Sequence, residues 1–135
     1  MYGLKQAGFQ GGGSGTATKK TTGTAKDAHS IIVWGDDGRP AHLNGDYVRD
    51  EDEQATYLRE LLEVFEAEGV DAAFVYTFAR YDLPHRDDSH VDFDTASAGV
   101  VKVLDAQSGA RGRRYPDMPW EPKAAFTTLA AWYGR

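Results

Sequence analysis

The stretch that decides the fold runs from Asp50 to Ala79 and reads DEDEQATYLRELLEVFEAEGVDAAFVYTFA. Asp50 can cap a helix, and Glu53, three residues later, can complete a capping box. Gly69 stands where a left-handed residue commonly ends a helix. The spacing predicts an amphipathic helix over 51–68, and its buried stripe is formed by Ala55, Leu58, Leu61, Leu62 and Phe65.

The segment that follows Gly69, residues 70–79, is apolar without alternation. Such a run is typical of a strand covered on both faces, as in a parallel sheet. A helix, a glycine cap and an apolar strand together form the second half of a β-α-β unit. The sequence therefore predicts an α/β fold.

Shorter elements lie on both sides of this unit. Residues 31–34 predict a strand that ends at a turn over 36–40, and residues 100–104 predict another strand. A last helix is predicted to open at 119–122, with Pro122 in its first turn. Its buried residues are expected to be Ala125, Phe126, Leu129, Ala130 and Tyr133.

The first residues have a different composition. Residues 11–24 are mostly Gly and Thr and contain no large apolar side chain. Such a stretch buries too little surface to offset its ordering entropy. We predict a flexible extension over 1–29, without secondary structure in 1–28, and a single ordered domain over 30–135.

Composition excludes several classes of function. The 135 residues carry a net charge of −6 and no cysteine, which rules out disulfides, a thiolate nucleophile and cysteine-ligated zinc. The apolar runs are too short to span a bilayer, and the acidic centre of the chain repels nucleic-acid phosphates. We expect a soluble, cytoplasmic protein with no cofactor and neither nucleic acid nor membrane as a partner.

The polar loop after the 70–79 strand holds the candidate binding residues. Aromatic rings can stack on the C–H faces of a sugar while charged groups bond its hydroxyls, so carbohydrate is the candidate ligand. A loop solvated by its own charges is an equally good interpretation. The candidate substrate-binding residues are Tyr76, Phe78, Arg80, Tyr81, Asp82, His85 and Trp120, and no catalytic residue can be assigned.

The same loop contains ligand types that suit divalent metals. These residues are Asp82, His85, Asp87, Asp88, His90, Asp92 and Asp94. Their spacing matches no defined motif, so we predict no metal site.

An ordered set of short motifs carries a resemblance. The motifs are Asp46–Arg49, Gln54–Leu58, Gly69–Phe78, Ala98–Val101 and Glu121–Phe126. Together they resemble the seventh helix, the eighth strand and the final segment of (β/α)8-barrel glycoside hydrolases. The chain is also similar to uncharacterised actinobacterial barrel proteins, some of them labelled abortive phage infection proteins.

The resemblance implies the last βα units of a TIM-barrel glycosidase-like fold, that is, an incomplete barrel, because a whole barrel needs about 250 residues. A retaining glycosidase uses two carboxylates about 5 Å apart. The family nucleophile is a Glu that ends the seventh strand, and no Glu precedes Glu51. The acid/base Glu belongs to the fourth strand, which this length cannot contain. Tyr76 also stands where the family often has a sugar-stacking Trp.

We therefore expect a truncated segment whose family activity, hydrolysis of O-glycosidic bonds, is absent from the chain alone; whether it is an enzyme at all stays open. The alternatives are a non-enzymatic interaction or phage-defence (abortive infection) protein, and the remnant of a truncated gene. An incomplete barrel would leave Phe74, Tyr76 and Phe78 partly exposed, which predicts either self-association through the exposed sheet edge or only marginal stability as a monomer.

Overall fold

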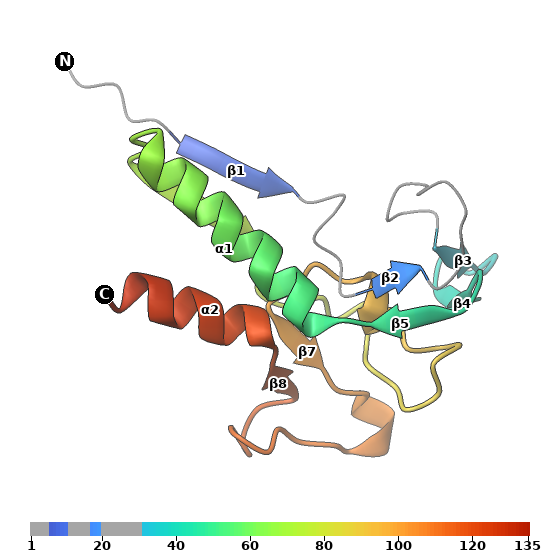
Figure 1. Ribbon diagram of the computed structural model, residues 1–135. Coiled ribbons are helices and arrows are strands. Elements are labelled where there is room, and N and C mark those ends of the chain that lie inside the picture. Colours follow the sequence, from blue (N-terminus) through green and yellow to red (C-terminus); the bar gives the residue numbers. More distant parts are fainter. Residues whose placement is uncertain (1–5, 11–16, 20–30) are drawn as a thin grey trace.

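The computed structural model describes residues 6–10, 17–19 and 31–135, and within them the chain is a mixed α/β structure (Figure 1). The described part holds two α-helices, four two-stranded sheets and two short 3-10 helices. In chain order the elements are β1 (Gln6–Gln10), β2 (Ala17–Lys19), β3 (Ile32–Trp34), β4 (Pro40–Leu43), β5 (Tyr47–Arg49), α1 (Glu51–Ala67), β6 (Ala72–Tyr76), η2 (Phe93–Ala96), β7 (Val101–Val103), η3 (Ala106–Ser108), β8 (Trp120–Pro122) and α2 (Ala124–Tyr133).

Helix α1 forms as its sequence predicts. The Asp50 carboxylate accepts a hydrogen bond from the Glu53 N–H at 2.8 Å, which caps the first turn. Gly69 has φ +67°, and the Val70 N–H bonds the Phe65 carbonyl at 2.9 Å, which closes the last turn. Leu58 and Leu62 are buried at the centre of the stripe.

Strand β6 belongs to a two-stranded sheet. It pairs in parallel with β1, in a register that runs from Gln6 opposite Ala72 to Gln10 opposite Tyr76. Figure 1 shows α1 and α2 side by side, and the buried core between them includes Val101 and Ala125. Ala73 and Val75 of β6 pack against this core.

The other face of β6 is open. The side chains of Phe74 and Tyr76 are 63% and 62% exposed. The predicted coverage of both faces of residues 70–79 is therefore wrong, because the helices lie on one face only. Partial exposure of Phe74, Tyr76 and Phe78 was the consequence expected of an incomplete barrel, and the structure shows it for all three.

The remaining sheets are short and antiparallel. They pair β2 with β5, β3 with β4 and β7 with β8. A second core, formed by Ile32, Leu43, Leu83 and Phe93, lies under the β3–β4 hairpin. None of the described helices is both long enough and apolar enough to cross a bilayer.

Three further expectations need correction. Ala130 and Tyr133, predicted among the buried residues of the last helix, are exposed. The prediction of no secondary structure in residues 1–28 is wrong at β1 and β2, since both strands find partners far along the chain; the rest of that segment lies outside the described residues. The last helix begins at Ala124, two residues after Pro122. Residues 120–122 form β8 instead, because they pair with β7.

Candidate functional site

The candidate site is built on the loop that leaves the carboxyl end of β6. A cis peptide bond joins Tyr76 to Thr77. The Val101 N–H then bonds the Phe78 carbonyl at 3.1 Å, and the His85 N–H bonds the Val103 carbonyl at 2.7 Å. The start and the middle of the loop are thereby attached to β7.

A buried ion cluster lies beneath this loop. Asp94, on η2, places its Oδ2 2.7 Å from Arg49 Nη2 and 3.1 Å from Lys123 Nζ. The side chain of Asp94 is 1% exposed and that of Lys123 is fully buried. One carboxylate therefore joins β5, the loop and the residue that precedes α2.

Burial sets the electrostatics of this ion cluster. It raises the pKa of Asp94, against the attraction of Lys123 and Arg49, and it lowers the pKa of Lys123. The Arg49 guanidinium also binds Glu51 at 2.9 Å, and Glu51 accepts the N–H of Ala124 at 3.2 Å. Burial alone would raise the pKa of Glu51, but Arg49 and this amide outweigh it and lower the pKa overall.

His85 extends the ion cluster toward the surface. Its Nδ1 lies 3.0 Å from Asp92 Oδ1, and the N–H of Arg86 donates to the same oxygen at 3.3 Å. Asp92 in turn lies 3.7 Å from Arg49 Nη1. His85 is therefore held in place by the cluster and borders the cavity described below.

The glutamate of this ion cluster gives a pH-dependent prediction. Because the pKa of Glu51 is lower in the folded chain than its ordinary value of 4.5, its stabilisation is present above that value and is lost as the pH falls through the folded pKa. Gln removes the charge and, with a single carbonyl oxygen, can accept only one of the two hydrogen bonds that the Glu51 carboxylate accepts from Arg49 and Ala124. Glu51→Gln should lower stability at neutral pH by up to about 1 kcal/mol and flatten the loss of stability below about pH 4.5.

Urea denaturation at a series of pH values measures this effect. Glu60→Gln, on the exposed side of the same helix, is the control and should keep the parent profile. The raised pKa of Asp94 affects the pH dependence of stability in the opposite direction, but Asp94 is present in the parent and in both variants. If Glu51→Gln lost stability below about pH 4.5 as steeply as the parent, the loss could not be attributed to Glu51.

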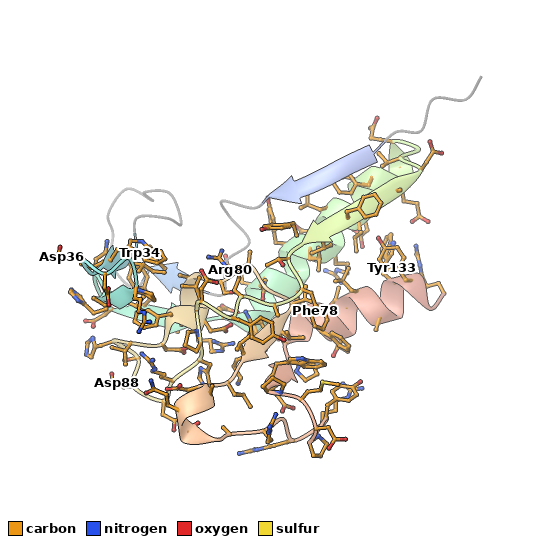
Figure 2. The ribbon with its side chains drawn as sticks, turned by 180° about the vertical axis from the view of Figure 1, so that it is seen from behind. Trp34, Asp36, Phe78, Arg80, Asp88 and Tyr133 are labelled. Carbon is orange, nitrogen blue, oxygen red and sulfur yellow. The ribbon has the colours of Figure 1, made fainter. Side chains whose placement is uncertain are left out.

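Two cavities border the loop. The first, of about 410 Å³, separates the β3–β4 hairpin from the loop and is lined by Trp34, Arg39, Asp82 and Arg86 among others. The Trp34 side chain is about half exposed, and Figure 2 shows it at the opposite end of the molecule from Tyr133. An accessible indole beside charged groups can stack on a sugar ring and bond its hydroxyls. We call this the hairpin cavity.

The second cavity, of about 680 Å³, lies beside the β7–β8 sheet and is bordered by the segment from Asp105 to Arg113. His85 and Arg86 reach it from the loop. We call this the basic cavity, because its lining includes Lys102, Arg111 and Arg113.

Of the predicted binding residues, the structure brings Phe78 and Trp120 together. Their ring centroids are 5.4 Å apart in an edge-to-face arrangement. The rings of Tyr115 and Phe126 also contact the Trp120 ring. Phe78 is labelled in Figure 2. Trp120 is thus packed among three aromatic neighbours. Its position favours a role in holding β8 to α2 rather than a free stacking surface.

The other predicted binding residues lie at different places in the structure. Arg80 and Asp82 form a two-point ion pair at 2.8 and 2.6 Å, and Asp82 lines the hairpin cavity. His85 belongs to the ion cluster and to the basic cavity. Tyr76 and Tyr81 are exposed, and neither lines these two cavities.

Several residues of the site could not be recognised from sequence. Trp34 looked like the end of an apolar strand, and Asp94 was considered only as a metal ligand. Arg49 and Lys123 entered only as parts of the family-like motifs. The sole signal for the buried cluster was a charged residue beside apolar neighbours, as in the Pro122–Ala125 segment.

The acidic loop residues do not gather around one point. Within residues 31–135, no group of three or more His, Asp or Glu side chains is arranged to hold a metal ion. Asp92 and Asp94 contact cations instead, and His90 faces Asp46 at 3.9 Å.

Comparison with known proteins adds no identification. No family model matches this chain. A search of curated proteins found no match either.

Proposed function

We propose that this chain is the closing part of a glycoside hydrolase-like (β/α)8 barrel, and that it binds carbohydrate without hydrolysing it. The observation that carries the proposal is the parallel pairing of β1 with β6, which the short strands β2 to β5 and then α1 separate in the sequence. Parallel neighbours joined through a helix are the repeating unit of such a barrel.

The two faces of β6 support the same assignment. Ala73 and Val75 contact the helical side, while Phe74 and Tyr76 are exposed on the other side. In a closed barrel one face of each strand packs on the outer helices and the other faces the interior. An incomplete barrel leaves that inner face open.

The absence of catalysis follows from β1. In the family, the nucleophilic Glu ends the seventh strand, and β1 holds the corresponding place before α1. It ends at Gln10, in register with Tyr76. No Glu precedes Glu51 in the sequence, so the two-carboxylate mechanism of the family has no counterpart to its nucleophile.

The hairpin cavity is the proposed sugar site. Asp82 follows the carboxyl end of β6, the end at which barrel enzymes bind their substrates. Trp34 offers a stacking surface, while Arg39 and Arg86 offer donors for hydroxyl groups. A cavity with aromatic walls and a few placed polar groups suits a small ligand.

Calorimetric titration of the chain with neutral oligosaccharides tests the proposal. We expect millimolar or tighter binding, lost in Trp34→Ala and weakened about tenfold in Asp82→Asn, since each hydrogen bond to a charged group contributes about 1.5–3 kcal/mol. Tyr133→Ala, an exposed aromatic on the far end of α2, is the control and should bind as the parent does.

The same preparation should not hydrolyse nitrophenyl glycosides above background. Turnover that disappears in Asp82→Ala would show that a loop carboxylate is catalytic and that the proposal is wrong. Equal loss of sugar binding in the Trp34 and Tyr133 variants would also refute the hairpin cavity as the site.

A non-enzymatic interaction role is the second candidate. The exposed face of β6, formed by Phe74 and Tyr76, favours it because adjacent exposed aromatic side chains often mark an interaction surface. We propose that this face associates with a second copy of the chain, and the Discussion gives the test.

A further inference from the structure

The basic cavity has a charge pattern unlike that of the whole chain. The protein carries a net charge of −6, yet Lys102, Arg111 and Arg113 all line this one cavity. Within residues 31–135 none of these three cations has a carboxylate within ion-pair distance. Three cations on one concave surface repel one another unless an anion is present.

The carboxylates beside the cavity are mostly engaged elsewhere. Asp105 holds Arg86 at 3.0 Å and accepts the N–H of Gln107 at 3.0 Å. Glu121 lies directly opposite Lys102 in the β7–β8 register, where an ion pair would be expected. Its carboxylate accepts the backbone N–H groups of Arg113 and Arg114 instead.

Lys102 lines the cavity without a carboxylate at ion-pair distance, although its charge also attracts Glu51 at longer range and lowers the pKa of that carboxyl. Glu121 holds the backbone of the segment that carries Arg113, and its carboxylate, which also lines the cavity, forms no ion pair with Lys102. Asp87 and Glu121 are the lining carboxylates without an ion pair in the described part of the chain, and against Lys102, Arg111 and Arg113 they leave one positive charge in excess.

We propose that the basic cavity binds the oxyanion group of a small molecule, a phosphate ester or a carboxylate. Guanidinium groups match the geometry of both groups through paired hydrogen bonds, and an ammonium adds a point charge. The volume of about 680 Å³ is that of a small-molecule site. Arg86 borders both cavities, but Arg111 and Arg113 line only this one.

Calorimetric titration of the full chain with glucose 6-phosphate, glucuronate, inorganic phosphate and glucose tests the proposal. At least one of the anions should bind, more weakly as the salt concentration rises, while glucose should not bind in this cavity. Binding of glucose 6-phosphate and inorganic phosphate alone identifies a phosphate site, and binding of glucuronate alone identifies a carboxylate site.

The matched variants locate the binding. Arg111→Ala with Arg113→Ala should weaken anion binding at least about tenfold, since charge-assisted hydrogen bonds are lost. Both side chains are exposed and the Arg113 N–H remains, so the fold should persist. Arg59→Ala removes an exposed charge from α1 and should leave the affinity unchanged.

No anion binding up to about 10 mM, a weak affinity of roughly −2.7 kcal/mol, would overturn the proposal. So would an equal loss in the Arg59 variant or full affinity in the double variant. The outcome is separate from that of the carbohydrate proposal, because loss of neutral-sugar binding in Trp34→Ala concerns the other cavity.

Discussion

Replacement of Asp94 with alanine should destabilise the chain by about 3–5 kcal/mol, enough to unfold much of a small domain. The change removes the carboxylate that lies 3.1 Å from the fully buried Lys123 and 2.7 Å from Arg49, which keeps Glu51 at 2.9 Å. The two positive charges would then face each other without it. Urea denaturation followed by circular dichroism measures the loss.

The matched control is Asp82→Ala. Asp82 also forms a close ion pair, with Arg80 at 2.6 Å, but its side chain is 52% exposed. Water replaces a surface partner, so this change should cost less than about 1 kcal/mol. Lys123→Met added to Asp94→Ala should recover part of the loss, because it removes the buried charge whose carboxylate neighbour at 3.1 Å has been taken away. Equal losses in the two single variants would contradict the buried cluster.

The second large effect concerns molecular mass in solution. We expect light scattering coupled to gel filtration to give the parent a mass of at least twice 14.8 kDa. Phe74 and Tyr76 form the exposed face of β6, and their burial against a second copy is favourable at about 25 cal/mol per Å². Phe74→Ser with Tyr76→Ser should give a monomer.

Val64→Ser is the control for this experiment. Val64 is also exposed, at 55%, but it lies on α1 rather than on β6. This variant should keep the mass of the parent. A parent that is a clean monomer with a sharp, reversible thermal transition would show that these residues close a core alone, and the incomplete-barrel proposal would then fall.

Local signals were sufficient to predict the parts of the fold that are determined locally. Helix α1 has its cap, its stripe and its terminal glycine within one short stretch, and the structure confirms all three. The α/β class, the strand within 70–79 and the strand within 100–104 are also confirmed. The reciprocal half of the capping box, from the Glu53 side chain, is not among the contacts observed around α1.

The elements that depend on distant partners were missed. β1 and β5 are short and become strands through pairing with β6 and β2, respectively. Trp120–Pro122 begins with an aromatic and ends with a proline, a pattern equally typical of a helix start, and only its pairing with β7 decides the outcome.

The candidate site was harder still. Arg49, Asp94 and Lys123 are ordinary charged residues in the sequence, and their burial arises only when three separate segments meet. Trp34 and Asp82 likewise share a cavity only because the hairpin folds over the loop. Neither the periodicity nor the residue spacing of a single sequence indicates which distant segments come into contact.

Because the ion cluster needs all three segments, it can form only after the last of them has left the ribosome. The polypeptide leaves the exit tunnel from its amino end, so Arg49 emerges first, Asp94 later and Lys123 last. Until Lys123 emerges, the nascent chain cannot close the cluster, and α1 has no α2 to pack against. During that interval the apolar stripe of α1 is open to chaperones and to neighbouring nascent chains. Synonymous codons that slow translation between residues 94 and 123 should therefore lower the yield of folded protein.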